Sequence, residues 1–239
     1  MTSPQSASLI NHTGLPYLEM IGSLGKALDP KTYLEIGTDK GRSLAQMKCA
    51  SVAIDPDFRI SGNVMEGKPV CHLFQMSSDR FFREFDLGAF LKPCVDMAFL
   101  DGMHRFEFLL RDFANTERFC RRNSIILLHD CFPTTVEMTA RVRGDLVAWT
   151  GDVWKMLPAL AKHRPDLRMV YLDCPPTGLV AVTNLSPASE VIATSYWAIV
   201  DEFGDADPAN DLPKLYETIE MTDSRTVLDD EKLTRTFWL

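Results

Sequence analysis

Five short apolar runs alternate with longer amphipathic stretches in the first part of this chain. The runs are TYLEI (32–36), SVAID (51–55), CHLFQ (71–75), VDMAFLD (95–101) and SIILLHD (124–130). Runs of this length, apolar on both faces, are typical of strands in a parallel sheet covered by helices. We expect the helices at 17–28, 42–50, 79–90, 106–121 and 152–163. The alternation therefore predicts an α/β fold.

A different pattern follows residue 165. Two apolar runs, LRMVYLDC (167–174) and GLVAVTNL (178–185), are joined only by Pro-Pro-Thr. Such a short connection cannot hold a crossover helix, so the two runs should pair antiparallel as a hairpin. We expect a further helix at 189–203, an acidic loop, and a tail ending Phe-Trp-Leu that folds back on the body or onto a partner. The predicted units are an N-terminal arm and helix (1–30), the α/β domain (31–185) and a C-terminal helical extension packing on the domain or a partner subunit (186–239).

The charge balance and the cysteines limit the class of partner. The chain has 25 Lys and Arg against 33 Asp and Glu, a formal net charge of -8. This balance disfavours nucleic acid, because phosphate binding depends on Lys and Arg. We find no secretory signal, no apolar stretch near the ~20 residues of a membrane span, and no CxxC pair among the cysteines. We therefore expect a cytoplasmic protein with free thiols and no membrane partner, and a homo-oligomer stays open.

The junction after the first run carries the strongest functional motif. Residues 33–44 read YLEIGTDKGRSL, with Glu35 before Gly37, then Gly41 and Ser43. A glycine-bearing turn between a strand and a helix lets the backbone approach a ligand and points free N–H groups at it. The G-x-G-x-x-G of dinucleotide folds is absent, which argues against a nucleotide-dependent oxidoreductase. The motif predicts a site for a nucleotide-like cofactor, with a plain strand–helix junction as the alternative.

Acidic and polar residues also follow the next two runs. Asp55 stands about 20 residues beyond the first strand, where nucleotide-binding α/β folds place an acid on ribose hydroxyls. An Asp-Pro turn at a strand end is the alternative for this residue. Ser77 and Ser78 follow the third run, and either is suited to cap a helix. We interpret Asp55 as the ribose ligand.

Two aspartates and two histidines follow the fourth and fifth runs. Residues 99–104 read FLDGMH and residues 127–131 read LLHDC. The carboxyl ends of neighbouring parallel strands converge on the crevice where such folds bind ligands. We therefore expect Asp101, His104, His129 and Asp130 to meet there. A helix-start residue and a buried strand-end imidazole are the structural alternatives for the two histidines.

Together the E-x-G-x-x-x-G-x-S, D-G-x-H and H-D motifs resemble class I S-adenosylmethionine-dependent methyltransferases, in particular the branch with small-molecule and sugar O-methyltransferases. The resemblance covers about residues 30–185. It implies a Rossmann-like three-layer sandwich whose seven-stranded sheet has the order 3-2-1-4-5-7-6, with strand 7 antiparallel. It also implies S-adenosylmethionine as cofactor, with the methionine end near the first motif, the ribose on Asp55 and adenine near Ser77 or Ser78. The implied cofactor-binding residues are Glu35, Gly37, Asp39, Gly41, Ser43, Asp55, Ser77 and Asp101.

The same resemblance suggests how an acceptor is activated. In a metal-dependent branch, acids at the ends of strands four and five hold Mg²⁺, and Asp101 and Asp130 stand at those positions. The residue after Asp130 is Cys131, a thiol that Mg²⁺ tolerates poorly. Mg²⁺ or another divalent metal is thus an open alternative, including a softer ion with His104 or His129. In a sugar O-methyltransferase subgroup a histidine at the offset of His104 is the proposed general base, and His129 is the second catalytic candidate.

We expect transfer of a methyl group from S-adenosylmethionine to a hydroxyl of a small molecule, of natural-product or sugar type, by direct displacement. A base with a pKa near neutrality suits this chemistry, because the hydroxyl must lose its proton as it attacks. A small-molecule N-methyltransferase and a non-catalytic binding module of the same fold are the alternatives. Residues 149–155 (WTGDVWK) open the next helix, where Thr150 or Asp152 is expected as a cap and Trp149 or Asp152 as a wall of the acceptor pocket.

Overall fold

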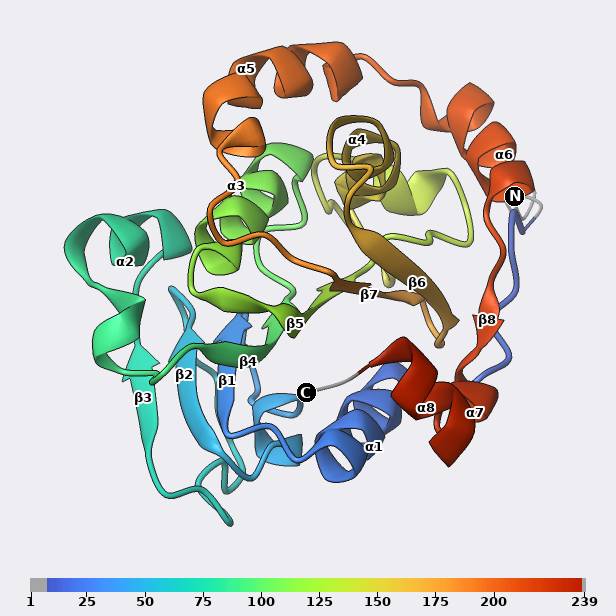
Figure 1. Ribbon diagram of the computed structural model, residues 1–239. Helices are drawn as coiled ribbons and strands as arrows, with labels where there is room; N and C mark the ends of the chain where they lie inside the picture. The colour runs from blue at the N-terminus through green and yellow to red at the C-terminus, as the bar shows by residue number, and fades with distance from the viewer. Residues whose placement is uncertain (1–7, 238–239) are drawn as a thin grey trace.

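The computed structural model describes residues 8–237. Their strands form an eight-stranded sheet of order β3-β2-β1-β4-β5-β7-β6-β8 (Figure 1). The predicted order of seven strands is confirmed, and β8 adds an unpredicted strand beside β6. The strands are β1 (Thr32–Ile36), β2 (Ala50–Ile54), β3 (Cys71–Phe74), β4 (Val95–Leu100), β5 (Cys120–His129), β6 (Arg168–Asp173), β7 (Leu179–Thr183) and β8 (Thr222–Asp223).

The direction of the strands follows the two patterns of the sequence. Strands β1 to β5 pair in parallel, whereas β7 runs antiparallel to both β5 and β6. The predicted hairpin of the two later runs is therefore confirmed. Strand β8 pairs with β6 in parallel over only two residue pairs, Leu172 with Thr222 and Asp173 with Asp223. So short a strand gives no apolar run that a sequence pattern could reveal.

The helices cover both faces of the sheet. In Figure 1, α2, α3, α4 and α5 lie on one face, and α1, α7 and α8 lie on the other. Helix α3 turns an apolar stripe toward the sheet, because Phe106, Leu109, Leu110 and Phe113 are all buried. The helices are α1 (Tyr17–Leu28), α2 (Ser78–Glu84), α3 (Phe106–Glu117), α4 (Met156–His163), α5 (Val191–Gly204), α6 (Pro208–Thr218), α7 (Ser224–Val227) and α8 (Asp230–Thr236).

The helix expected at 42–50 is wrong. Only a 3₁₀ helix forms there, Leu44–Gln46, before the chain enters β2. The ammonium of Lys68 donates to the carbonyl oxygens of Leu44, at 2.7 Å, and of Met47. The Leu44 carbonyl also accepts the Met47 N–H at 3.2 Å, so the Lys68 ammonium binds at the end of this single turn. A single 3₁₀ turn has little macrodipole, so the expected anion site at a helix N-terminus after β1 has no support.

Two other expected helix boundaries need correction. The helix expected at 79–90 ends at Glu84, and a separate 3₁₀ helix follows at Leu87–Ala89, where Asp86 accepts the Gly88 N–H at 3.0 Å. The helix expected from residue 152 begins as a 3₁₀ helix at Val153–Lys155 and continues as α4. Neither Thr150 nor Asp152 caps it. Asp152 instead accepts the Phe106 N–H at 2.9 Å and so caps α3, which lies far away in the sequence.

The C-terminal segment is more ordered than the expected acidic loop and tail. It forms α6, β8, α7 and α8, and Phe237 is buried with the cluster under α1. Helix α6 begins with Asp207, whose side chain accepts the Ala209 N–H at 3.0 Å, followed by Pro208 in the first turn. An acidic cap followed by proline is a helix-start signal that the sequence analysis passed over. The expected terminal residues Trp238 and Leu239 lie outside the described residues, as do residues 1–7.

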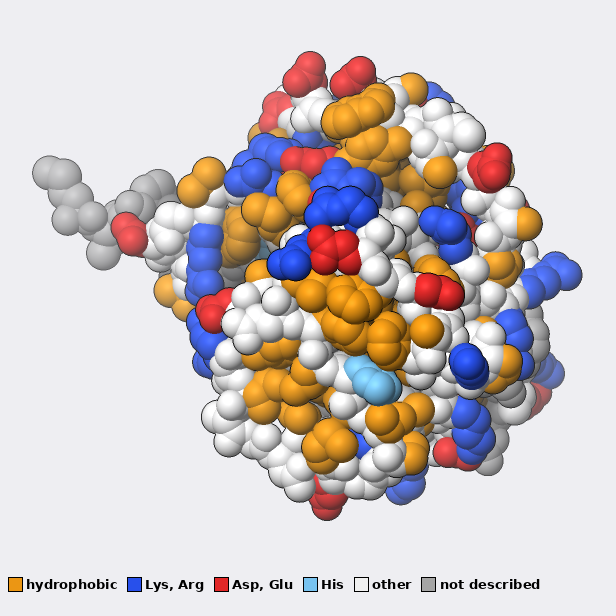
Figure 2. All heavy atoms as spheres, turned by 90° about the vertical axis from the view of Figure 1, so that its left-hand side faces the viewer, with side chains coloured by type: hydrophobic (Ala, Val, Ile, Leu, Met, Phe, Trp, Pro, Cys, Tyr) orange, Lys and Arg blue, Asp and Glu red, His pale blue; other side chains and the backbone are white. Residues whose placement is uncertain are grey.

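The surface shows one broad apolar region. Figure 2 looks onto the β3 side of the molecule, where hydrophobic side chains gather between charged ones. Leu73 in β3, Phe85 after α2 and Trp197 in α5 are among the exposed large hydrophobic residues. None of the helices within residues 8–237 has the length and apolar character that a membrane crossing would need.

Candidate functional site

The register of the parallel strands brings the predicted site residues into one row. Ile36 pairs with both Ile54 and Leu100, and Leu100 pairs with Leu128. The next residue of each strand is therefore at the same edge of the sheet. Those residues are Gly37, Asp55, Asp101 and His129.

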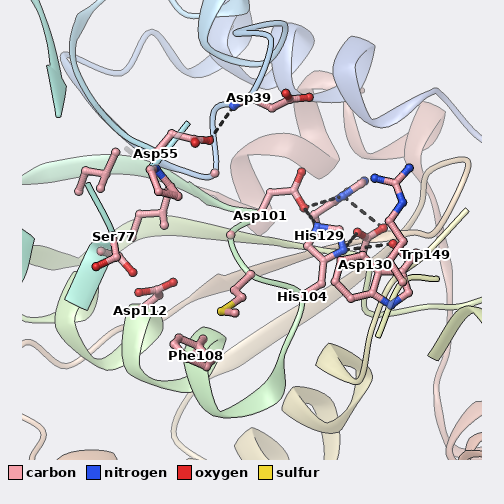
Figure 3. Close-up of a pocket in the computed structure, with 18 of the residues that line it drawn as sticks. Asp39, Asp55, Ser77, Asp101, His104, Phe108, Asp112, His129, Asp130 and Trp149 are labelled. Carbon is pink, nitrogen blue, oxygen red and sulfur yellow. Dashed lines mark hydrogen bonds and ion pairs between the residues drawn. The ribbon is translucent and has the colours of Figure 1, made fainter. Parts of the chain in front are cut away.

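A cavity of about 600 Å³ opens along this row. Figure 3 shows Asp55, Ser77 and Asp112 toward one end, and His104, Asp130 and Trp149 toward the other, with Asp101 between them. We call the first the Asp55 end and the second the His104 end. Gly37, Asp39, Asp55, Ser77 and Asp101 of the predicted cofactor residues line the cavity, and so do His104, His129 and Asp130.

The carboxylate of Asp55 is held in place by the backbone. Its Oδ2 accepts the Asp39 N–H at 2.8 Å, and its Oδ1 accepts the Asp57 N–H at 2.7 Å. Asp39 has a positive φ of 46° and forms an ion pair with Arg59 at 2.7 Å. Each carboxylate oxygen still has a lone pair after accepting one N–H. Asp55 can therefore accept two hydroxyl groups without losing its own support.

Ser77 has the role of a helix cap and also borders the cavity. Its side chain accepts the Arg80 N–H at 3.3 Å at the start of α2. The helix-cap alternative considered for this residue is thus what the structure shows, and its position at the wall leaves its hydroxyl near any ligand.

Three predicted cofactor residues lie beneath the cavity instead of lining it. Glu35 is fully buried and accepts the hydroxyl of Tyr33 at 2.7 Å, and burial raises the pKa of Glu35 to about 7 against this hydrogen bond. Ser43 is buried at the 3₁₀ helix. Gly41, with a φ of +74°, packs where a Cβ would lie 2.7 Å from a methyl of Val64. Their direct contact with a cofactor stays a prediction that this arrangement does not favour.

Gly37 is required by the protein itself. Its φ is +87°, and a Cβ there would lie 2.0 Å from the Asp101 carbonyl oxygen. The glycine is therefore needed because the backbone after β1 passes very close to the backbone after β4. The glycine-bearing turn keeps the row of strand ends tight enough for Asp101 to reach the cavity.

At the His104 end, two histidines and two aspartates contact each other. His104 Nε2 lies 3.3 Å from Asp101 Oδ1, and its Nδ1 lies 3.1 Å from Asp130 Oδ2. His129 Nδ1 lies 3.2 Å from Asp101 Oδ1 and 3.4 Å from Asp130 Oδ1. The sequence-based expectation that these four residues meet is confirmed as a matter of geometry.

Aromatic rings and the backbone fix the orientation of the two imidazoles. His104 stacks on Trp149 at 4.9 Å between centroids and 15° between planes, and its Nδ1 lies 3.1 Å from the Trp149 carbonyl oxygen. His129 packs against Tyr17 of α1 at 4.1 Å. Asp130 also accepts the hydroxyl of Thr177. His104, His129 and Asp130 thus each have a support outside the cluster.

The charges of the cluster strengthen both bases. Burial opposes the charged form of His104, but the hydrogen bond and charge of Asp101 and the charge of Asp130 raise its pKa to about 9. For His129 the two aspartates likewise outweigh burial and raise the pKa to about 10. The histidines in turn lower the pKa of Asp101 despite its burial. The arrangement favours imidazolium–carboxylate pairs, so each imidazole is protonated at neutral pH and accepts a proton only after it has given one up.

Strained backbone conformations gather at this cavity. Five non-glycine residues in the described chain have positive φ, and Asp39, His104 and Asp130 among them line the cavity. Such conformations cost of order 1–3 kcal/mol and cluster at functional sites. The strain at His104 and Asp130 is consistent with a built site instead of a chance gathering of charges.

Asp101, His104 and Asp130 could also hold a metal ion. One ligand atom from each lies within 4.8 Å of the others. Cys131 is fully buried, with its Sγ 3.5 Å from the His129 carbonyl oxygen, and burial raises the pKa of this thiol well above its usual range. Cys131 therefore does not replace the missing acid at the position after Asp130. His104 is the third ligand in this arrangement.

The sequence analysis missed several residues that line the cavity. Asp112 is buried on α3, and burial, with the charge of Asp79 and against a hydrogen bond from Ser78, raises its pKa to about 7. An acid three residues after Leu109 lies toward the buried side of an amphipathic helix, a signal that could have been read. Met103, Phe108, Arg143 and Val147 also line the cavity and carry no such signal.

Part of this chain is similar to known proteins. Residues 34–131 match the family model for a methyltransferase domain. No curated protein matches the chain. Similar solved structures include the O-methyltransferase TomG of Streptomyces achromogenes in complex with S-adenosylmethionine (14% identity, 71% of this chain, 80% of that chain, TM-score 0.49). Another is an O-methyltransferase of Bacillus cereus in complex with S-adenosylhomocysteine (12% identity, 73% of this chain, 84% of that chain, TM-score 0.49). At these identities and scores, no activity or substrate is taken from either structure.

Proposed function

We propose that this chain, whose residues 34–131 match the family model for a methyltransferase domain, transfers the methyl group of S-adenosylmethionine to a hydroxyl oxygen of a small molecule. One observation carries this proposal: a single cavity joins Asp55 to the cluster of Asp101, His104 and Asp130. The Asp55 end offers an acid suited to ribose hydroxyls, and the His104 end offers an imidazole that can accept a proton in its neutral form. A donor and an acceptor can therefore meet in one cavity, as a direct displacement requires.

The Asp55 end fits a nucleoside cofactor with a positive charge. The Asp55 carboxylate keeps acceptor capacity on both oxygens, and Ser77 and Asp112 lie beside it in the wall. Aspartates outnumber Arg residues in the lining, so the cavity favours a cation. S-adenosylmethionine, when bound, supplies a methyl group activated by a sulfonium charge. The fit supports the cofactor without fixing its pose.

We assign His104 as the general base that accepts the proton of the acceptor hydroxyl. It is part of the His104 end, and its pKa is raised by Asp101 and Asp130 against burial. Only the neutral imidazole takes the hydroxyl proton as the oxygen attacks, so this step is favoured as the pH rises toward 9, and the two carboxylates stabilise the imidazolium that results. His129 shares both carboxylates and so sets their charge and orientation. A positioned base of this kind contributes ~10²- to 10⁴-fold to a rate.

The same side chains have an alternative function, which is to bind a divalent metal. Asp101, His104 and Asp130 would hold it, and it would lower the pKa of the acceptor hydroxyl. An imidazole nitrogen that binds a metal cannot also accept a proton. The general-base and metal-ligand roles of His104 therefore exclude each other, and we assign the base role.

Titration calorimetry with S-adenosylmethionine, S-adenosylhomocysteine and NADH tests the proposal. We expect binding of the first two and none of NADH, because the turn after β1 lacks the third glycine of dinucleotide sites. Tight binding of NADH alone would overturn the assignment. Binding of S-adenosylmethionine without turnover on any hydroxyl compound would favour the binding-module alternative.

A further inference from the structure

Two arginines near the mouth of the cavity have opposite surroundings. Arg141 donates to Glu107 at 2.5 Å and also to Asp152, which ties the segment 141–149 to α3 and to the start of α4. Arg143 lines the cavity, is exposed, and has no side-chain hydrogen bond, ion pair or ring contact with any residue in 8–237. The first arginine is used by the fold, and the second is available to a ligand.

The carboxylates of the cavity do not need Arg143. Each has a partner elsewhere: an ion pair, a histidine, a backbone N–H or a serine hydroxyl. The pairs are Asp39 with Arg59, Asp55 with the N–H of Asp39 and Asp57, Asp79 with Arg111, Asp101 and Asp130 with the two histidines, and Asp112 with Ser78. An unpaired guanidinium beside satisfied carboxylates is left to attract an anion from solution.

Apolar and aromatic side chains surround the same mouth. Met103 is 51% exposed and Val147 is 98% exposed, and both line the cavity. The indole of Trp149 stacks on His104, and both residues line the cavity, so flat rings form part of its wall. Exposed apolar side chains around a cavity mark a site that an apolar ligand covers. A flat wall favours a planar ring over a flexible chain.

We propose that the acceptor is a hydroxylated aromatic carboxylate, whose carboxylate binds Arg143 and whose ring packs among Met103, Val147 and Trp149. This inference rests on the proposed function, because it assigns the hydroxyl to the neighbourhood of His104. Arg143 is then a specificity-determining residue: it selects the acid over the uncharged compound of the same ring. The bidentate geometry of a guanidinium suits a carboxylate.

Binding of matched probes to the protein saturated with S-adenosylhomocysteine tests this inference. Protocatechuate and catechol share a dihydroxylated ring and differ by one carboxylate. We expect protocatechuate to bind the unmodified protein about tenfold or more tightly than catechol, because a charged hydrogen bond is worth ~1.5–3 kcal/mol. Arg143→Gln should abolish that preference and leave the affinity for S-adenosylhomocysteine unchanged.

Arg118→Gln is the matched control. Arg118 is exposed, follows α3, and does not line the cavity. Its replacement by Gln changes the net charge by the same amount as Arg143→Gln but leaves the cavity intact. It should keep the preference for protocatechuate. Equal affinity of the unmodified protein for the two probes, or no binding of protocatechuate, would overturn the inference. Weaker S-adenosylhomocysteine binding in Arg143→Gln would overturn it too, by placing Arg143 on the cofactor. Failure of the unmodified protein to bind S-adenosylhomocysteine would contradict the proposed function itself, and the inference with it.

Discussion

The two ends of the cavity are built in different ways. At the Asp55 end, the carboxylate is 7% exposed and is held by two backbone N–H groups at the ends of paired strands. At the His104 end, the cluster itself is anchored, but its outer wall comes from the exposed segment 141–149. The first end depends on the sheet, and the second depends on a loop held by Arg141.

This difference separates what the fold determines from what the loop determines. The strand register fixes the positions of Asp55, Asp101 and His129 before any ligand is present. The family match ends at residue 131, so the segment that carries Arg143 lies beyond it. Loops on a rigid scaffold are where binding specificity varies most. The cofactor should therefore follow from the fold, and the acceptor from the loop.

The largest effect that separates the two ends is expected at His104. His104→Asn keeps a residue that tolerates the positive φ of 53° while removing the base. We expect turnover to fall ~10²- to 10⁴-fold, with unchanged affinity for S-adenosylhomocysteine. Steady-state rates and calorimetry check this pair of results. His163→Ala, at a surface histidine paired with Glu202, is the control. Normal turnover in His104→Asn would remove His104 from the mechanism.

A smaller effect, on stability, is expected at Asp112 in the wall of the Asp55 end. Burial raises the pKa of Asp112 to about 7, so the folded state holds this proton more tightly than the unfolded state. The stability that the protonated form contributes is complete below the unfolded pKa and is lost as the pH rises through about 7. Asp112→Asn cannot titrate there.

Urea unfolding of the cofactor-free protein measures this effect. Between about pH 5 and pH 8, the free energy of unfolding of the variant should improve relative to the unmodified protein by on the order of 2 kcal/mol. Glu35, whose pKa is also raised to about 7 by burial, is present in both proteins, so its effect cancels in the difference. Parallel pH curves for the two proteins would show that Asp112 is not a buried titrating acid.

An effect on binding alone is expected at Asp55. Asp55→Asn preserves the shape of the side chain but removes the charge that faces the ribose hydroxyls and replaces one oxygen, which accepts the N–H of Asp39 or Asp57, by an amide NH2 that cannot accept. We expect the affinity for S-adenosylhomocysteine to fall ~10- to 100-fold, as for loss of a charged hydrogen bond. Asp57→Asn, two residues along and exposed, should bind normally. Equal loss in both variants would point to the loop and away from the Asp55 carboxylate.

The smallest effect is expected from removing metal ions. Asp101, His104 and Asp130 already form ion pairs with each other, and His104 is assigned to the proton. Dialysis against a chelator should leave turnover on a hydroxyl acceptor unchanged. A loss of turnover that added Mg²⁺ restores would instead assign the three side chains to a metal and take the base role away from His104.

Most of the sheet was predictable because apolar runs report burial directly. The strands at 32–36 and 71–74 and helix α1 were placed to within a residue, and the convergence of Asp101, His104, His129 and Asp130 followed from the strand ends. The expected helix at 42–50 is only one 3₁₀ turn, and the carbonyl oxygens of Leu44 and Met47 at its end accept hydrogen bonds from the ammonium of Lys68, about 20 residues later. A local sequence pattern does not predict a hydrogen bond to such a distant residue.

The residues around the cavity were less predictable than the row of residues at the strand ends. Glu35, Gly41 and Ser43 carry the motif but do not line the cavity, and motif spacing alone does not distinguish a ligand contact from packing. The pairing of Arg141 with Glu107 and Asp152, which leaves Arg143 free, depends on how a loop crosses two helix starts. The periodicity of apolar residues in the sequence does not predict the path of this loop.

A crystal structure of the protein with S-adenosylhomocysteine tests the division of the cavity most directly. The account predicts that the ribose hydroxyls bond to the Asp55 carboxylate and that the sulfur points toward His104, with Arg143 not contacting the cofactor. A cofactor whose ribose lies away from Asp55, or whose carboxylate is bound by Arg143, would contradict it.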